Sequence, residues 1–253
     1  MKIGKIVLII IMIIIFIAGL GYLAYYWFYG RNAPGVESVP VTEGPIEHLT
    51  GDELFVSNFD SEEDLSKWEI FDDDGAQEEP SHWFFEDGVL KQDSNIWGGS
   101  FGIPVKNKSY LGSQIVTKDG ADWQNYYVHL RLKPLDNDGV GFLVRYQNKN
   151  NYLRIFIIQD KTQDNGGPFI KIDKRVKGKT IGLYVKKFTY NVGQWNDVNI
   201  LVKGKRTTFW FGEEKTKSNS IWATDGTFKK GRFGFSVYAE EGVEFDDVVI
   251  EKR

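Results

Sequence analysis

Residues 125–133 read Asn-Tyr-Tyr-Val-His-Leu-Arg-Leu-Lys, and this stretch decides the fold class. Two kinds of side chain alternate along it. One face of an extended chain would carry Tyr127, His129 and Arg131, and the other would carry Tyr126, Val128, Leu130 and Leu132. Successive side chains of a strand point to opposite faces of its sheet, so the stretch predicts a strand with one buried face.

Runs of the same kind follow at residues 139–146, 152–159, 169–173, 180–184, 197–203, 207–211, 231–238 and 243–251. Clusters of Gly, Asn, Asp and Lys separate them, as in Val202-Lys-Gly-Lys-Arg206, which is typical of a short hairpin turn. The one helical candidate, Ser61–Lys67, is a turn or two long. Closely spaced strands without an amphipathic helical stretch predict an all-β sandwich of two antiparallel sheets.

The first thirty residues are of a different kind. No side chain between Ile6 and Gly30 is charged, and Ile6–Leu20 is almost wholly Ile, Val, Leu, Met and Phe. About twenty apolar residues in a helix span a hydrocarbon core of roughly 30 Å. Lys2 and Lys5 precede the run and an aromatic cluster at 22–29 ends it, which favours a cytoplasmic N-terminus. The sequence therefore predicts a single-pass anchor in the lipid bilayer through residues 6–29, with everything after Arg31 extracytoplasmic.

A cleaved signal peptide is the alternative, because Ala18-Gly19-Leu20-Gly21 offers small residues at which cleavage occurs. The uncharged run continues past that point, which favours a retained anchor at residues 1–30. Residues 31–52 contain three prolines and three glycines and show no apolar periodicity, so they predict a flexible linker. The sandwich is then residues 53–253.

Composition excludes some classes of partner. Residues 31–253 carry 29 basic and 35 acidic side chains, a formal charge of −6 (29 − 35). Domains that bind nucleic acid present a basic face, so this balance argues against nucleic acid. The chain has no Cys, which excludes disulfides and a lipid attached to an N-terminal Cys. About 200 residues bury a core large enough to stabilise a domain without cross-links.

The order of four segments resembles the concanavalin A-like lectin/glucanase jelly roll. The opening strand and its L-x-x-W turn match Leu54–Ser61 with Leu65–Trp68, and the second strand with its Asp-Gly turn matches Trp83–Leu90. The long hairpin matches Tyr127–Tyr146, and the closing strand matches Val243–Ile250. Each motif is short, so their order carries the resemblance. It implies a jelly-roll sandwich over most of residues 53–251.

The resemblance also implies one structural calcium ion. Bacterial β-glucanases of this superfamily often hold it with two backbone carbonyls and a carboxylate of the last strand. The matching positions here are the carbonyls of Asn58 and Gly88 and the side chain of Asp246. Calcium binds such oxygens at about 2.3–2.6 Å. The alternative is that Asp246 forms an ion pair or caps a strand end.

Two other acidic runs, at residues 72–75 and 136–139, begin like calcium-binding loops. In the second, Asp136-Asn-Asp-Gly139, no Glu stands at the far end of a twelve-residue loop, as such a site requires. Asp, Asn and Gly are also the residues that form tight turns, and turns are what we predict at both places.

The residues that cleave glucans in the family are missing at their usual place. The active members carry Glu-x-Asp-x-x-Glu or Glu-x-Asp-x-Glu on one strand of the concave face, because retaining hydrolysis needs two carboxyl groups about 5–5.5 Å apart. The strand that matches in order is Tyr152–Ile158, and its cleft-facing positions are Tyr152, Arg154 and Phe156. Neither motif occurs elsewhere in the chain.

An aromatic and basic surface remains at that position. We expect Arg145, Tyr152, Arg154 and Trp210 to bind a glycan, since aromatic rings pack against sugar C–H faces and arginine donates forked hydrogen bonds to hydroxyls or carboxylates. The alternative is that these rings belong to the core and the arginines to satisfied pairs.

Three functions are compatible with these features of the sequence. The first is a membrane-anchored, extracytoplasmic, lectin-like module without catalytic residues, which the missing acids favour. The second is a divergent glycoside hydrolase or lyase, for example a relative of the 3-keto-glycoside hydrolases, with Asp122, Glu86 or Glu240 as candidate carboxylates. The third is a structural or adhesion domain.

Overall fold

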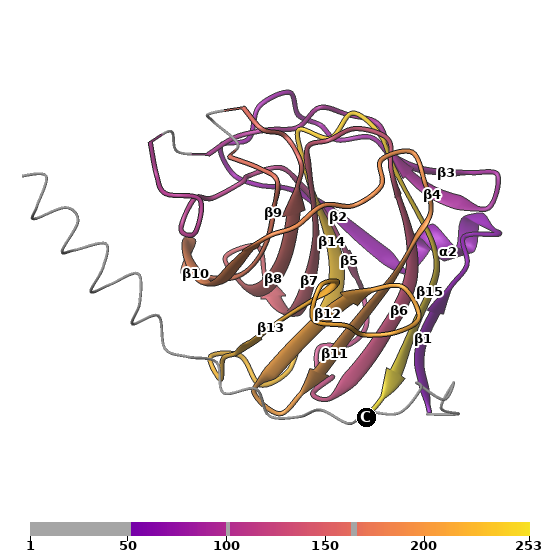
Figure 1. The fold of residues 1–253 in the computed structure, drawn as a ribbon. Helices are drawn as coiled ribbons and strands as arrows, with labels where there is room; N and C mark the ends of the chain where they lie inside the picture. Colours follow the sequence, from indigo (N-terminus) through magenta and orange to yellow (C-terminus); the bar gives the residue numbers. More distant parts are fainter. Residues whose placement is uncertain (1–51, 100–101, 163–165) are drawn as a thin grey trace, which may run out of the picture. The chain divides into compact units, whose positions relative to one another are not determined.

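The computed structural model describes residues 52–99, 102–162 and 166–253. They form two antiparallel sheets packed face to face with one short helix, which confirms the predicted all-β sandwich (Figure 1). No helix within these ranges has the length and apolar character needed to cross a membrane. The predicted anchor at residues 6–29 and all but the last residue of the predicted linker lie outside the described residues, so both remain predictions.

One sheet has eight strands within the described residues, and β6 and β15 lie near its centre. Its order is β13 (Ser220–Thr224), β12 (Arg206–Phe211), β11 (Asn196–Lys203), β6 (Tyr126–Pro134), β15 (Val243–Lys252), β4 (Val89–Gln92) and β3 (Trp83–Glu86), and β1 (Glu53–Ser57) also pairs with β15.

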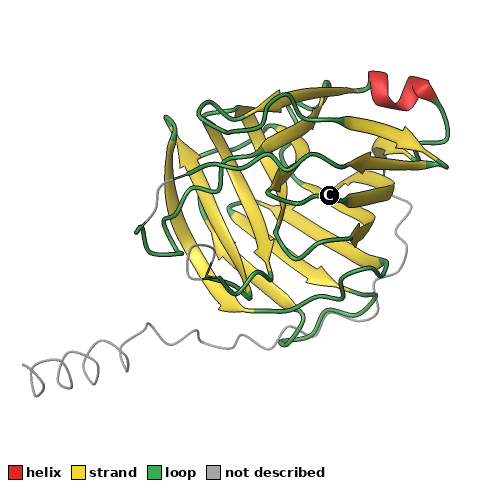
Figure 2. Cartoon of the chain, turned by 90° about the horizontal axis from the view of Figure 1, so that it is seen from above, coloured by secondary structure: helices red, strands yellow, loops and turns green. Residues whose placement is uncertain are grey.

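The other sheet has seven strands in the same ranges. Its order is β10 (Lys179–Lys187), β9 (Phe169–Val176), β8 (Asn151–Ile158), β7 (Gly139–Asn148), β14 (Arg232–Tyr238), β5 (Ser113–Thr117) and β2 (Trp68–Asp72). Figure 2 shows the strands of both sheets, with α2 (Glu62–Ser66) at the margin of the sandwich.

The hydrophobic core lies between the two sheets. Along β6, Val128, Leu130 and Leu132 are fully buried, whereas the intervening His129 and Arg131 are half-buried. The period-two pattern therefore predicts the buried face of this strand correctly. Rings from the two sheets meet in the core, as with Phe235 of β14 and Phe245 of β15, whose ring centres are 4.0 Å apart.

Strand β15 joins the first strand of the domain to the rest of the sheet. Ser57, at the end of β1, lies opposite Val248, and Leu90, near the start of β4, lies opposite Phe245. The register of β15 against β6 shifts between Asp246 and Val249. β1 and β4 therefore approach the same bulge of β15 from opposite directions.

Candidate functional site

The predicted cleft strand is β8, and its side chains divide between two faces. Leu153, Ile155 and Ile157 belong to the core between the sheets. Tyr152, Arg154 and Phe156 therefore point to the opposite, outward face of the seven-stranded sheet, the side on which the sequence places them. Tyr152 and Arg154 are nevertheless only 1% exposed.

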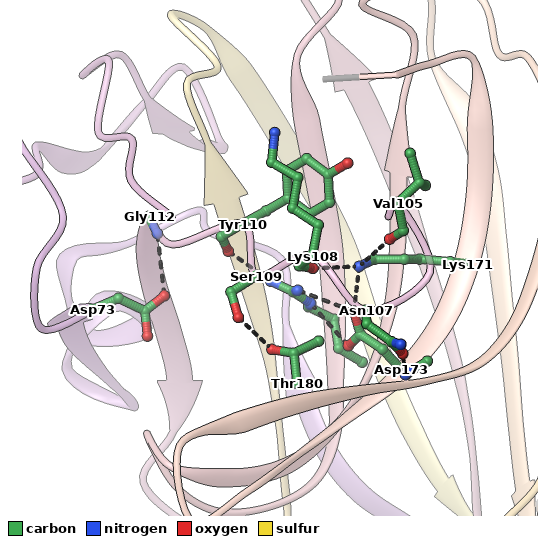
Figure 3. Close-up of polar contacts among 12 residues, drawn as sticks. Asp73, Val105, Asn107, Lys108, Ser109, Tyr110, Gly112, Lys171, Asp173 and Thr180 are labelled. Carbon is green, nitrogen blue, oxygen red and sulfur yellow. Dashed lines mark hydrogen bonds and ion pairs between the residues drawn. The ribbon is translucent and has the colours of Figure 1, made fainter. Parts of the chain in front are cut away.

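A segment that we call the strap, residues 105–112, covers this outward face (Figure 3). Lys171 of β9 donates from its Nζ to the carbonyl oxygens of Lys108, at 2.8 Å, and Val105, at 3.3 Å. Arg154 of β8 donates to the carbonyl oxygen of Tyr110 at 3.0 Å. Charged side chains of the sheet thus satisfy backbone groups of the strap, and the face beneath it is closed.

Side chains of the strap make further contacts with the sheet. The ring of Tyr110 stacks on Phe156 with 4.8 Å between ring centres. Asn107 accepts a hydrogen bond from the backbone N–H of Gly182 at 3.0 Å, and the Ser109 hydroxyl lies 2.8 Å from that of Thr180. The strap is therefore joined to β8 and β10 by both apolar and polar contacts.

Beneath the strap lies a buried group of charges. Arg154 contacts both carboxylate oxygens of Asp173, and the Nζ of Lys171 lies 2.8 Å from Oδ2 of the same carboxylate. Burial opposes ionisation of Asp173, but the charges of Arg154 and Lys171 outweigh it and hold its pKa below the ordinary value. Burial lowers the pKa of Lys171 to about 8 in spite of Asp173.

The other two predicted binding residues lie elsewhere. Arg145 is 1% exposed and has a left-handed backbone (φ 52°) at a bulge of β7. Its guanidinium donates to the carbonyl oxygens of Phe228, at 2.9 Å, of Gln124, at 3.3 Å, and of Gly204. In the structure Arg145 therefore connects loops at one end of the sandwich.

Trp210 lies on β12, whose neighbouring side chains Phe209 and Phe211 pack in the core. Its ring stacks on Tyr127 of β6, 6.0 Å away, on the outer face of the eight-stranded sheet. Trp210 is 3% exposed, and its Nε1–H has no hydrogen-bond partner among the described residues. The structure therefore brings Tyr152 and Arg154 together, and separates both from Arg145 and Trp210.

The sequence reasoning missed an accessible aromatic site, which we call the Trp195 patch: Trp195, Arg131, Lys133, Asp246 and Asp247. Trp195 precedes β11 and is 37% exposed. The Arg131 guanidinium lies 4.8 Å from its ring centre and Lys133 Nζ 5.7 Å. Arg131 also contacts the carboxylates of Asp246 and Asp247. The sequence feature that could have indicated this site is Trp195 itself, a tryptophan in a loop without strand periodicity.

The chain segments that carry Asn58, Gly88 and Asp246, the predicted calcium ligands, are adjacent at the β15 bulge. Asp60 Oδ1 would lie 3.3 Å from a Cβ built on Gly88, so the two chain segments are adjacent. The Asp246 carboxylate, however, is held by Arg131 and accepts the Asp247 N–H at 2.8 Å. In the described ranges no three His, Cys, Asp or Glu side chains form a group that could hold a metal. In this structure the Asp246 carboxylate is therefore already held by Arg131 and by the Asp247 N–H.

The three candidate carboxylates differ in environment. Asp122 and Glu86 are exposed and pair with Lys230 and Lys91. Glu240 is fully buried, its Oε1 accepts the Asp136 N–H at 2.9 Å, and its Oε2 has no partner among the described residues. Burial, with the charges of Asp136 and Asp138, raises its pKa to about 8.

Asp138 shares this region. Burial and the nearby carboxylates of Asp136, Asp160 and Glu241 raise its pKa to about 7. Two acids that retain protons near neutral pH thus lie at one end of the sandwich, and buried acids of this kind are candidates for proton transfer.

A family model described as a 3-keto-alpha-glucoside-1,2-lyase-like domain matches residues 54–251. No curated protein sequence is significantly similar to the chain.

Several solved structures share the fold. The carbohydrate-binding module CBM66 from Bacillus subtilis has a TM-score of 0.54 at 14% identity, covering 74% of this chain and 96% of that one. A Bacillus subtilis protein with a galectin-like fold has a TM-score of 0.59 at 11% identity, covering 80% and 96%. The exoplasmic/lumenal domain of VIP36 bound to Ca²⁺ and Man2 has a TM-score of 0.52 at 13% identity, covering 79% and 87%. At these identities the likeness concerns the fold.

Proposed function

Because the chain belongs to the family of 3-keto-alpha-glucoside-1,2-lyase-like domains, we propose that residues 53–253 bind carbohydrate. The observation that carries the proposal is the Trp195 patch, where an exposed ring adjoins a guanidinium held by two carboxylates. The ring offers a sugar an apolar surface, and the charged groups offer hydrogen bonds to hydroxyls. The concanavalin A-like sandwich, shared with a carbohydrate-binding module and a lectin, supports it.

The face under the strap supplies a second surface of similar chemistry. Tyr152, Arg154 and Phe156 form the aromatic and basic set that the sequence predicts for a glycan, but the strap covers Arg154 and Phe156, and Tyr152 packs with Tyr146 and Phe71. Binding there requires the strap to move, whereas the Trp195 patch is open. We therefore assign the first contact with the ligand to Trp195 and Arg131.

The domain acts, in this proposal, on the outer side of a membrane. Support comes from the uncharged run at residues 6–29, the lysines before it and the aromatic cluster that ends it. Its test is flotation of the full chain with vesicles in carbonate buffer, followed by protease digestion of spheroplasts. Release of residues 53–253 by external protease is expected, and full protection would overturn the orientation.

A glycan array tests the binding proposal, with Trp195→Ala as the variant and Trp222→Ala as the matched control. Both rings are exposed, by 37% and 39%, and both lie near an arginine. We expect Trp195→Ala to weaken binding of the best glycan at least tenfold, and Trp222→Ala less than twofold. Equal losses, or no binding to any glycan, would contradict the proposal.

Catalysis is the second candidate, and the environment of Glu240 favours it. A lyase or hydrolase needs a group that gives or takes a proton near neutral pH, and burial raises the pKa of Glu240 to about 8. Incubation with 3-keto-glucosides and with a polysaccharide panel tests this. Turnover that disappears in Glu240→Gln and persists in Asp122→Asn would establish it, and absence of turnover with every substrate would leave binding as the function.

Calcium belongs to the same proposal. The support is that the chain segments that carry Asn58, Gly88 and Asp246 are adjacent at the β15 bulge. Against it, Arg131 already neutralises the carboxylate. A bound ion would have to displace that guanidinium from Asp246.

A further inference from the structure

The charged side chains of the sandwich are separated between its two ends. We call one of them the β1 end, where the domain begins. There the backbone N–H of Lys252 donates to Asp52, that of Arg253 to Asn125, and that of Gly204 to the side chain of Asn125. The start of β1, the end of β15 and the β11–β12 turn therefore lie together, as Figure 1 also shows.

Two further turns reach the same end. The N–H of Asp225 donates to the Lys205 carbonyl at 2.8 Å, which brings the β13–β14 connection beside the β11–β12 turn. Arg232, at the start of β14, lies opposite Tyr146, near the end of β7, and the β7–β8 and β9–β10 turns are adjacent because β8 pairs with both β7 and β9.

Exposed basic side chains gather on these turns. They include Lys177, Lys179, Lys203, Lys205, Lys229 and Lys252. Exposed acids at this end include Asp52, Glu53, Asp119 and Asp122. Asp122 pairs with another exposed lysine, Lys230, and Lys149 of the β7–β8 turn pairs with the exposed Asp74. The β1 end is thus basic, although the whole chain has a net charge of −4.

The opposite end has the other sign. There burial and the nearby carboxylates of Asp136, Asp160 and Glu241 raise the pKa of Asp138 to about 7. A molecule with one basic and one acidic end orients itself in the field of a charged surface, and anionic lipid attracts the basic end.

The chain before β1 determines which end is near a bilayer. If residues 6–29 span the membrane, 22 residues (31–52) connect them to Glu53. A flexible linker of that length has a root-mean-square span of roughly 26 Å. A compact domain of about 200 residues has a radius of gyration of roughly 16 Å and is thus about 40 Å across. This average span is shorter than the domain, which favours the end that carries β1 as the end toward the lipid.

We infer that the β1 end docks on anionic phospholipid headgroups through the lysines of its turns. The inference rests on the proposed anchor, and it adds an orientation: the acidic end points away from the membrane. Trp222 supports it, because this ring is 39% exposed beside Arg206 near the same end, and tryptophan is enriched at membrane interfaces.

Single-cysteine labelling of the full chain tests the inference, because the chain contains no native Cys. A fluorophore is placed at Thr224→Cys near the β1 end or at Gln194→Cys at the other, in nanodiscs that contain spin-labelled lipid. We expect at least threefold stronger quenching at 224 than at 194 with 30% phosphatidylglycerol. The ratio should fall toward one in pure phosphatidylcholine or in 0.5 M NaCl, which screens the charges.

Charge reversal supplies the control. Lys203→Glu with Lys205→Glu and Lys229→Glu should abolish the preference for position 224. The matched triple Lys161→Glu, Lys187→Glu and Lys217→Glu, at exposed sites near the other end, should leave it unchanged. Equal quenching at both positions in the wild type, or equal effects of the two triples, would overturn the inference.

If the full chain fails to insert into a membrane, the proposed anchor is refuted. A second experiment then tests the contact with lipid separately. Both sheets and their core lie within residues 52–253, so this part is made separately and sedimented with phosphatidylglycerol vesicles at low salt. Binding that the first triple weakens at least fivefold, and the second less than twofold, supports the docking surface. No binding in that arm overturns it.

Discussion

Arg154 and Asp173 form a two-point ion pair beneath the strap, with Nε 3.3 Å from Oδ1 and Nη2 3.1 Å from Oδ2. Each side chain is 1% exposed. Removing one partner from a buried pair leaves an uncompensated charge, which costs far more than the pair itself contributes. This geometry turns a predicted ligand contact into a determinant of stability.

We therefore expect Asp173→Asn to destabilise the domain by about 3–5 kcal/mol, because Arg154 and Lys171 would lose their shared carboxylate. Urea denaturation measures the change. Asp122→Asn, which removes an exposed carboxylate paired with Lys230, is the control and should change stability by less than about 1 kcal/mol. Similar effects of both variants would mean that the pair under the strap is solvated.

Lys171 should resist acylation. Its pKa is lowered to about 8, so an accessible amine there would react readily at pH 8, but the strap buries it completely. In a pulse of acetic anhydride followed by peptide mass spectrometry, we expect Lys171 to react at least a hundredfold more slowly than the exposed Lys205. Comparable rates would show that the strap opens readily and that the face below it is accessible to ligands.

Glu240→Gln should stabilise the domain increasingly as the pH rises. The folded-state pKa of Glu240, about 8, lies above its ordinary value of 4.5. Below about pH 4.5 the Glu240 carboxyl is protonated in both the folded and the unfolded state, so it does not change the free energy of unfolding. Between about pH 4.5 and pH 8 only the folded state keeps this proton, so the free energy of unfolding falls as the pH rises.

Melting temperatures of the wild type and Glu240→Gln at pH 5 and pH 8 check this. The variant should gain on the wild type by roughly 4 kcal/mol at pH 8 and by about 1 kcal/mol at pH 5. A gain of equal size at both pH values would show that the buried carboxyl does not titrate as inferred.

Asp246→Asn should lower the melting temperature even in EDTA, because it removes one of the two carboxylates that pair with Arg131. A calcium ion at the β15 bulge would add a second, calcium-dependent part, so we expect a larger drop in calcium than in EDTA. The thermal shift is measured in both buffers, with Asp119→Asn as a surface control. Equal drops in the two buffers would leave Asp246 with the ion pair alone.

The strands with clear period-two patterns were predictable, and some others were not. All five residues of β5, Ser113-Gln-Ile-Val-Thr117, are buried, so no alternation of polar and apolar residues marks this strand. β13 and β2 are equally short and were not predicted either. In each case tertiary pairing, with β14, β12 and β5 respectively, determines the strand.

The outward orientation of Tyr152 and Arg154 followed from alternation, but their burial did not. The strap reads Val-Lys-Asn-Lys-Ser-Tyr-Leu-Gly, which is typical of a solvated loop. Its partners Lys171 and Arg154 lie 63 and 44 residues from the carbonyls that they bind. A local sequence pattern cannot predict a contact between residues that far apart in the chain. Likewise, the order of the family's segments predicted that the segments of Asn58, Gly88 and Asp246 would be adjacent, but nothing predicted the pairing of Arg131 with Asp246.

The pairing of β15 with β1, β4 and β6 also determines when the domain is completed. Residues 243–252 follow all the other strands along the chain, yet they occupy the middle of the eight-stranded sheet. The other strands leave a ribosome or an export channel before β15 does. Until β15 emerges, the edges of β1 and β4 that pair with it are unpaired. Unpaired edges attract other chains, and the interval before β15 emerges is therefore the period in which this domain most needs protection by a chaperone.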